Sequence, residues 1–188
     1  MTSGIGLCGA HRVGKTTLAQ AVSRATGIPF LKTHTSHIFQ QHGLDPAKPM
    51  AFDTRLAIQQ EILAAGEAVW RQAAGPFISD RTPLDMAAYT LADIHGTTTL
   101  NETAFTQYLT DCLAATNRYF STLIIVPPGI PLVPEPGKAA LHDAYIEHIH
   151  TLIAGLCHDD RISAKVHHIG RGILSLDARV AHTVAHLP

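Results

Sequence analysis

The sequence has no large excess of positive or negative charge. Its 188 residues include 14 Lys and Arg against 15 Asp and Glu, which gives a net charge of −1 and an isoelectric point near 6.9. No cluster of Lys and Arg stands out along the chain. A protein whose main task is to grip duplex DNA usually carries a basic face, so the composition argues against a broad electrostatic footprint for nucleic acid.

Cysteine and long apolar runs are also scarce. The three cysteines, Cys8, Cys112 and Cys157, form no Cys-x-x-Cys pair, which is typical of free thiols in a reducing compartment. No apolar stretch is long enough to span a bilayer, and the first three residues lead straight into an apolar run without a signal peptide. We therefore expect a soluble cytoplasmic protein without membrane contact. The length suits a single domain over residues 1–188, and the oligomeric state stays open, a dimer included.

Short apolar runs alternate with longer helical patterns, which is typical of an α/β fold with a parallel sheet flanked by helices. The expected strands cover about 5–8, 28–31, 77–79, 123–126 and 165–169. The expected helices cover about 15–26, 36–42, 52–74, 83–94, 102–120, 140–157 and 176–187. Five prolines between positions 127 and 138 exclude regular structure there, and we expect this segment to be a lid-like loop or an ordinary rigid connection.

The segment that follows the first expected strand has the P-loop spacing Gly-x4-Gly-Lys-Thr. It reads GAHRVGKTT from Gly9 to Thr17. This spacing lets successive backbone N–H groups, and the start of the next helix, point at a polyphosphate. Lys15 supplies a charge for the β- and γ-phosphates and the Thr16 hydroxyl suits Mg²⁺, so ATP and Mg²⁺ are the expected cofactors. The residues expected to bind the nucleotide here are Gly9, His11, Arg12, Val13, Gly14, Lys15, Thr16 and Thr17.

Asp80 and Arg81 come directly after the third expected strand. Ligands of doubly wound sheets sit beyond the carboxyl ends of the strands, so Asp80 is expected to hold Mg²⁺ together with Thr16. The alternative role for Asp80 is the N-cap of the next helix. The guanidinium of Arg81 suits the oxygens of a transferring phosphoryl group, and its alternative is an exposed surface position.

Further candidates carry weaker signals. Arg55 and Gln59 are four residues apart on one helix and share a face, which suits either an acceptor site or a solvated polar stripe. Lys138 ends the Pro-rich loop, from which it could reach the transferring phosphoryl group as a catalytic residue. Arg171 stands between two glycines after the last expected strand, where the turn could cradle the adenine ring.

Taken together, these motifs resemble a family of small phage and bacterial P-loop kinases known as AAA-domain or nucleotide-kinase-like proteins. The resemblance rests on GAHRVGKTTLA, on RLAIQ from Arg55 to Gln59, and on ISDRTPLD from Ile78 to Asp85 followed by Tyr89. It covers most of the chain. The wider relatives are thymidylate, deoxynucleoside and nicotinamide riboside kinases, and some members resemble phage kinases that phosphorylate hydroxymethyluracil in DNA.

The resemblance implies a P-loop NTPase fold with a five-stranded parallel sheet in the order 2-3-1-4-5. It implies that Asp80 and Arg81 match the acid–arginine pair that holds Mg²⁺ and the acceptor phosphate, and that Arg55 and Gln59 face the acceptor. The other residues expected at the acceptor are His34, Asp53 and Asp85.

The chain departs from these relatives at two places. Its lid carries only Lys138 where related lids often carry arginine, and Lys32-Thr33-His34 stands where deoxynucleoside kinases commonly place an acid. An alcohol acceptor benefits from a general base, whereas an anionic phosphate acceptor needs none. The missing acid therefore favours a monophosphate acceptor, unless Asp80, Asp53 or His34 serves as the base.

The leading hypothesis is a kinase that transfers the γ-phosphoryl group of ATP to a nucleotide-like acceptor, above all a (deoxy)nucleoside monophosphate. A second hypothesis keeps the chemistry and takes 5-hydroxymethyluracil in DNA as the acceptor, which would make DNA a partner. A third is an NTP-binding switch or ATPase without a small-molecule acceptor. The length argues against the third, because large mechanical ATPases usually carry more domains than 188 residues can form.

Overall fold

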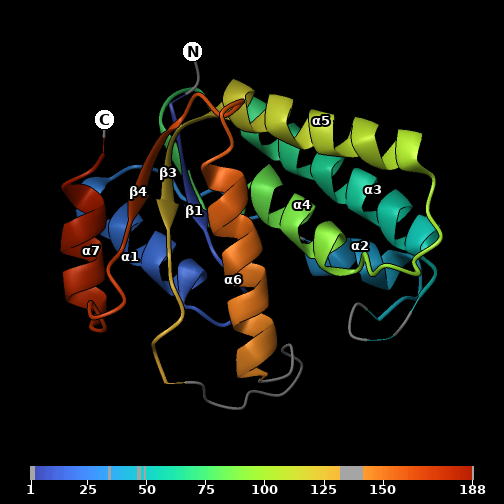
Figure 1. Cartoon of the computed structure of the whole chain (residues 1–188). Helices are drawn as coiled ribbons and strands as arrows, with labels where there is room; N and C mark the ends of the chain where they lie inside the picture. The colour runs from blue at the N-terminus through green and yellow to red at the C-terminus, as the bar shows by residue number, and fades with distance from the viewer. Residues whose placement is uncertain (1–2, 34, 46–47, 49, 132–141, 188) are drawn as a thin grey trace.

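A computed structural model describes residues 3–33, 35–45, 48, 50–131 and 142–187. In these residues, four strands form one parallel sheet in the order β2-β1-β3-β4 (Figure 1). The strands are β1 (Gly4–Cys8), β2 (Phe77–Ser79), β3 (Phe120–Ile125) and β4 (Lys165–His168). Because all four strands are parallel, their carboxyl ends meet at one edge of the sheet.

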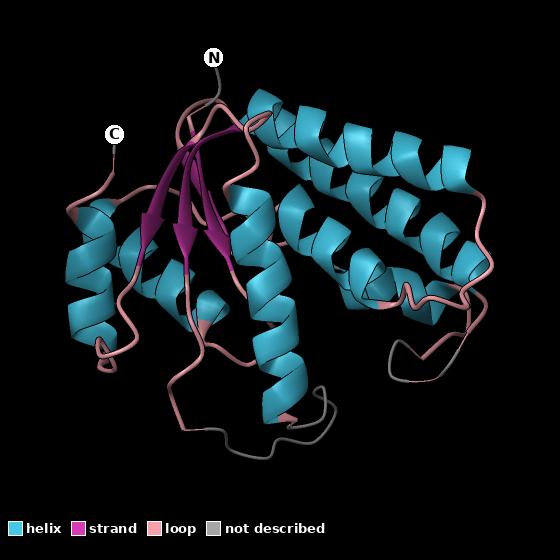
Figure 2. Cartoon of the chain, in the orientation of Figure 1, coloured by secondary structure: helices cyan, strands magenta, loops and turns pink. Residues whose placement is uncertain are grey.

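Helices cover both faces of this sheet (Figure 2). The helices are α1 (Lys15–Thr26), α2 (Thr35–Gln41), α3 (Phe52–Arg71), α4 (Pro83–Ala92), α5 (Glu102–Tyr119), α6 (Asp143–Cys157) and α7 (Leu176–Val184). On one side α1 packs against α7, and on the other side α4 packs against α3, α5 and α6. Among the helices that the structure describes, none has the length and apolar character that a membrane crossing requires.

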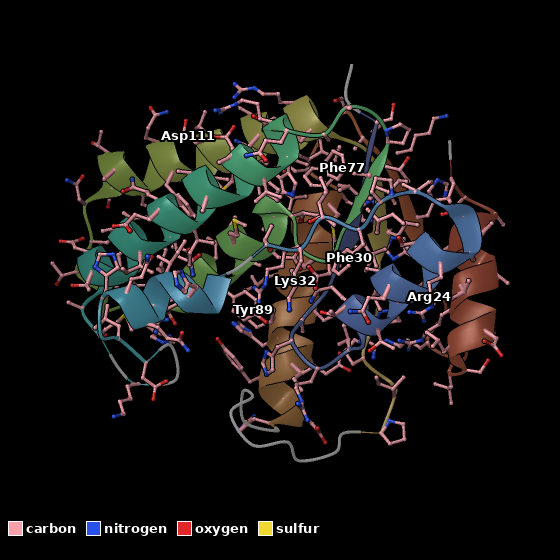
Figure 3. All side chains as sticks on the ribbon, turned by 180° about the vertical axis from the view of Figure 1, so that it is seen from behind. Arg24, Phe30, Lys32, Phe77, Tyr89 and Asp111 are labelled. Atoms are coloured by element: carbon pink, nitrogen blue, oxygen red, sulfur yellow. The ribbon has the colours of Figure 1, made fainter. Side chains whose placement is uncertain are left out.

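The expected strand over 28–31 is wrong as a full strand. Phe30 forms only an isolated parallel bridge with Ile78, and two hydrogen bonds support it: Leu31 N to Ile78 O at 2.8 Å and Ile78 N to Pro29 O at 2.9 Å. Pro29 has no N–H to donate, which helps to keep the ladder short. The segment still lies beside β2, as Figure 3 shows from behind with Phe30 labelled. The predicted order 2-3-1-4-5 therefore holds with its first member reduced to a bridge, and the sheet has four strands instead of five.

The strand expected over 123–126 starts three residues early, at Phe120, directly after the end of α5. The ring of Phe120 packs edge-on against Trp70, with 5.1 Å between centroids, and against Phe77, at 5.7 Å. These tertiary contacts hold Phe120 in the sheet, although the helical pattern of α5 extends through it. The remaining described elements lie within a few residues of the expected positions.

The core sits on both faces of the first three strands, which are almost completely buried. Such near-continuous apolar strands are typical of parallel sheets covered by helices. On α3, Leu56, Leu63 and Trp70 recur at seven-residue spacing and form a buried apolar stripe. Trp70 also donates a hydrogen bond from Nε1 to Ser79 Oγ at 3.2 Å, which ties the end of α3 to the end of β2.

Candidate active site

The P-loop connects β1 to α1 at the carboxyl edge of the sheet. Its first glycine has no room for a side chain, because a Cβ on Gly9 would lie 2.5 Å from the Val126 carbonyl oxygen. Gly14 has a φ of 88° and is the N-cap of α1, a left-handed position that favours glycine. Because Gly14 caps α1, the loop leads directly into the positive end of that helix, which is an arrangement that binds phosphate.

Lys15 crosses this loop from the first turn of α1. Its Nζ donates to the carbonyl oxygens of Gly9 and of Ala10, the latter at 2.7 Å, and lies 3.9 Å from Asp85 Oδ1. Burial lowers the pKa of Lys15, while the Asp85 carboxylate raises it and the charge of Arg81 lowers it again. The ammonium group thus sits at the centre of the loop, close to the position where a terminal phosphate would bind.

Asp85 is the residue that fixes the loop to α4. The residue is 0% exposed, and its Oδ1 accepts from Gly9 N at 2.9 Å. Oδ2 accepts from the N and Oγ1 of Thr82, at 2.9 and 2.7 Å, which completes a capping box on α4. The three-residue spacing of Thr82 and Asp85 is a sequence signal for this box. The structure places Asp85 beneath the P-loop, a position that does not favour contact with an acceptor. That contact stays a prediction.

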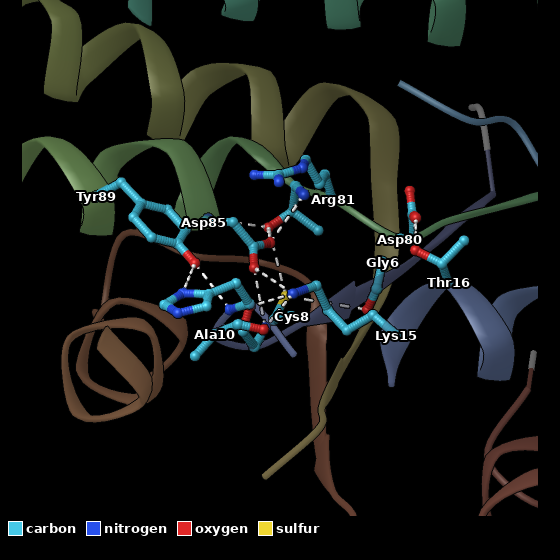
Figure 4. A network of polar contacts seen from close by, with 12 residues as sticks. Gly6, Cys8, Ala10, Lys15, Thr16, Asp80, Arg81, Asp85 and Tyr89 are labelled. Carbon is cyan, nitrogen blue, oxygen red and sulfur yellow. Dashed lines mark hydrogen bonds and ion pairs between the residues drawn. The ribbon is translucent and has the colours of Figure 1, made fainter. Parts of the chain in front are cut away.

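Thr16 and Asp80 bring two oxygen groups together at the mouth of the loop (Figure 4). Thr16 Oγ1 donates to Asp80 Oδ2 at 2.5 Å. The alternative role of Asp80 as the N-cap of α4 is wrong, because Thr82 is the N-cap. A hydroxyl and a carboxylate at this spacing are oxygen ligands of the kind that Mg²⁺ prefers.

Arg81 adds a second cation beside Lys15 and Tyr89. The side chain is partly exposed. In the part of the chain that the structure describes, its guanidinium forms no hydrogen bond or ion pair, and only its backbone bonds to Ser79. A cation without a neutralising carboxylate increases the positive potential at the mouth of the loop.

Tyr89 holds the P-loop from α4. Its hydroxyl oxygen accepts from His11 N at 2.8 Å and lies 3.0 Å from His11 Nδ1. Burial raises the pKa of Tyr89, which keeps its hydroxyl protonated. Tyr145 of α6 also lies near the imidazole, with 5.8 Å between ring centroids. The sequence motif includes Tyr89 but does not reveal this role.

Arg55 and Gln59, two of the expected acceptor residues on α3, are largely enclosed. Arg55 Nε pairs with Asp93 Oδ2 at 2.6 Å, and its guanidinium carbon lies 5.8 Å from the centre of the Phe39 ring. Burial raises the pKa of Asp93 while Arg55 lowers it. Gln59 is only 6% exposed. The alternative of a solvated polar stripe is therefore wrong, whereas contact with an acceptor stays a prediction. Asp93 carries no local signal in the sequence for this pairing.

Other predicted residues lie at the surface or outside the described residues. Arg171 forms a bidentate ion pair with Glu147 of α6, at 2.7 and 2.8 Å between exposed side chains. Thr17 and Asp53 are exposed on the first turns of α1 and α3. His34 and Lys138 lie outside the described residues, as does the Pro-rich loop beyond position 131. The nucleotide, acceptor and lid roles of all these residues stay predictions.

Arg179 of α7 reaches the P-loop from behind and was not predicted. Its Nη1 donates to Val13 O at 3.0 Å and its Nε donates to Ile173 O at 2.8 Å. Val13 lies 166 positions before Arg179 in the chain. No local pattern in the sequence points to such a contact.

Comparison with known proteins identifies the family. The model of the AAA domain family matches residues 5–172, a span that includes the P-loop, Asp80 and Arg81. The chain belongs to this family. Among curated proteins, none is significantly similar in sequence to this AAA domain.

Solved structures share the fold at low sequence identity. A NadR protein in complex with NR is 13% identical with a TM-score of 0.68, over 98% of this chain and 49% of that one, so this chain spans about half its length. A deoxyadenosine kinase from M. mycoides with the products dCMP and dCDP is 16% identical with a TM-score of 0.67, over 98% and 97% of the two chains. Thymidylate kinase from Candida albicans is 16% identical with a TM-score of 0.60, over 98% and 90%. The fold of this AAA domain is therefore that of P-loop nucleotide kinases.

Proposed function

We propose that this protein is an ATP- and Mg²⁺-dependent kinase that transfers the γ-phosphoryl group to a nucleotide-like acceptor. The observation that carries the proposal is the position of Arg81 beside Lys15, without a carboxylate partner among the described residues. A nucleotide-binding switch can hold its nucleotide with the P-loop cation alone. A second cation at the end of β2 suits a phosphoryl group in transit between two substrates.

The residues at the mouth of the loop fit Mg²⁺ and ATP. Thr16 Oγ1 and Asp80 Oδ2 supply hard oxygen ligands, and Gly14 at the N-cap of α1 places the positive end of that helix at the same point. Mg²⁺, when bound, neutralises phosphate charge and orients the β- and γ-phosphates. Lys15 and Arg81 would stabilise the negative charge that develops while the acceptor oxygen bonds to the γ-phosphorus and the bond to ADP breaks. Catalysis would thus consist mostly of positioning and charge neutralisation.

The described carboxylates at the site favour an acceptor that needs no general base. Asp85 is enclosed beneath the loop with both oxygens bonded, and Asp80 is bonded to Thr16. A monophosphate oxygen is already anionic and can attack without losing a proton. We therefore propose a (deoxy)nucleoside monophosphate as the acceptor, with Arg55 and Gln59 on its side of the site.

A phosphate-transfer screen tests the proposal. The protein is incubated with Mg²⁺ and ATP labelled in the γ-position, together with nucleoside monophosphates, nucleosides, DNA containing hydroxymethyluracil, or no acceptor. We expect label to move to a monophosphate. Label that moves only to a nucleoside or to the DNA would overturn the choice of acceptor. Release of labelled phosphate that no acceptor changes would overturn the kinase proposal and leave an ATPase.

A further inference from the structure

Arg179 is a buried cation directly behind the P-loop. The residue is 3% exposed, and burial lowers the pKa of its guanidinium. Two of its nitrogens donate to the carbonyl oxygens of Val13 and Ile173. Its third nitrogen, Nη2, is buried without a hydrogen-bond partner, and no carboxylate within the described ranges pairs with the group. An uncompensated buried charge is costly, so its position invites a functional explanation.

The bond to Val13 O fixes the direction of one peptide in the P-loop. The described part of the chain has no cis peptide bond, so the C=O of Val13 and the N–H of Gly14 point in opposite directions. Arg179 holds the C=O on the side of α7. The N–H of Gly14 therefore points away from α7, toward the concavity in which P-loop N–H groups bind phosphate.

The peptide between Val13 and Gly14 is free to change its orientation unless a contact fixes it. Gly14 has a φ of 88°, and glycine reaches positive and negative φ about equally well, so the Val13–Gly14 peptide can turn over at little steric cost. A charged donor on the carbonyl opposes that turn. Such a donor also polarises the peptide, which makes its N–H a stronger donor to an anion.

We propose that Arg179 is a positioning residue for the polyphosphate of the bound nucleotide. It keeps the Gly14 N–H directed at the phosphates, and its bond to Ile173 O ties the loop after β4 to the same point. The inference rests on the proposed function only in requiring that the P-loop binds a nucleotide. It does not depend on the acceptor or on phosphoryl transfer.

Calorimetric titration with inorganic tripolyphosphate and with ADP tests the inference. Tripolyphosphate has no nucleobase. Its affinity therefore reports the contacts to phosphate alone, without any effect of the loop after β4 on binding of the base. We expect R179M to weaken tripolyphosphate binding roughly tenfold or more, the loss that follows removal of one charged hydrogen bond. R179K keeps the charge without the guanidinium fork and is expected to recover part of the affinity. R161M is the matched control, because Arg161 is an exposed arginine paired with Asp159 in its own loop.

The outcomes separate the two proposals. Wild-type protein that binds neither ligand would overturn the proposed function and this inference with it. Wild-type binding with equal affinity in R179M would overturn this inference alone, whatever happens to the melting temperature. If R179M does not melt cooperatively, R179Q replaces it, since an amide can donate to one carbonyl but carries no charge. Wild-type affinity in R179Q would likewise contradict the proposal.

Discussion

Thr16 Oγ1 and Asp80 Oδ2 lie 2.5 Å apart and join the first turn of α1 to the residue after β2, 64 positions further along the chain. The pair places a hydroxyl and a carboxylate where the P-loop opens. In the proposed reaction these two groups would bind Mg²⁺.

Asp80→Asn tests that dependence, because an amide can still bond to Thr16 but brings no negative charge to a cation. We expect activity at a fixed Mg²⁺ concentration to fall about 10- to 100-fold, as changes around metal ligands typically do. Higher Mg²⁺ concentrations are expected to restore part of it. A Mg²⁺ titration of turnover measures both effects, with Asp111→Asn on the exposed face of α5 as the control. An unchanged Mg²⁺ requirement would rule out Asp80 as a metal ligand.

Lys15→Met removes the ammonium group at the centre of the loop and keeps the length of the side chain. We expect turnover to fall about 100- to 1,000-fold, the loss seen when a group that stabilises developing charge is removed. The fold is expected to persist, because burial already disfavours the charged form of Lys15. Initial rates and thermal melts measured on the same preparation check both statements. Normal turnover in the variant would contradict the proposed function.

Asp85→Asn changes the group that links the P-loop to α4. One carboxylate accepts from Gly9 N and from two groups of Thr82, whereas an amide has a single acceptor oxygen. One buried donor is then left unsatisfied, and we expect the free energy of unfolding to fall by about 1–3 kcal/mol. Urea denaturation measures the change. If the variant equals wild type in stability, the carboxylate does not hold the loop in place.

Tyr89→Phe removes the hydroxyl that accepts from His11 N. We expect the KM for ATP to rise about 2- to 10-fold, the value of one neutral hydrogen bond, with a smaller change in kcat. Tyr108→Phe is the matched control. The hydroxyl of Tyr108, on α5, accepts from Thr90 Oγ1 on α4 and does not contact the P-loop. The interpretation fails if both substitutions shift the KM for ATP alike.

His168→Gln tests the pH dependence of stability. Burial lowers the pKa of His168 and the neighbouring His158 lowers it further, while burial also lowers the pKa of His150 and His167. The unfolded chain, with histidine pKa values near about 6.5, therefore binds more protons than the folded chain at and below that pH. Stability is expected to fall as the pH is lowered from 7 to 5.

Urea denaturation at several pH values measures this dependence. We expect a shallower decrease in His168→Gln than in wild type, because one group with a lowered pKa has been removed. His37→Gln, on the exposed side of α2, controls for the loss of one histidine from the chain. Identical slopes in His168→Gln and wild type would contradict the assignment.

The parts predicted correctly from the sequence are those that depend on neighbours in the chain. The P-loop is one contiguous motif between an apolar run and a helix, and Asp80 is placed by the end of a single strand. By contrast, the early start of β3 depends on the contact between Phe120 and Trp70. Propensity and periodicity carry no information on such tertiary contacts.

The missed residues at the site have the same explanation. Arg179 is a polar residue on an amphipathic helix, and its burial follows from the packing of α7 against α1. Asp93 ends α4 and gains its importance only when Arg55 of α3 lies next to it. The Thr82–Asp85 spacing, by contrast, is a local signal and was available from the sequence.

The contact between Trp70 and Ser79 gives the protein an internal optical reporter. The chain has one tryptophan, so its indole emission comes from a single place. That indole is completely buried, packs against Tyr119 and Phe120, and bonds to the residue that precedes Asp80. Its fluorescence therefore reports loss of the core without any added label, from a position one residue away from the carboxylate on which the proposed metal binding depends.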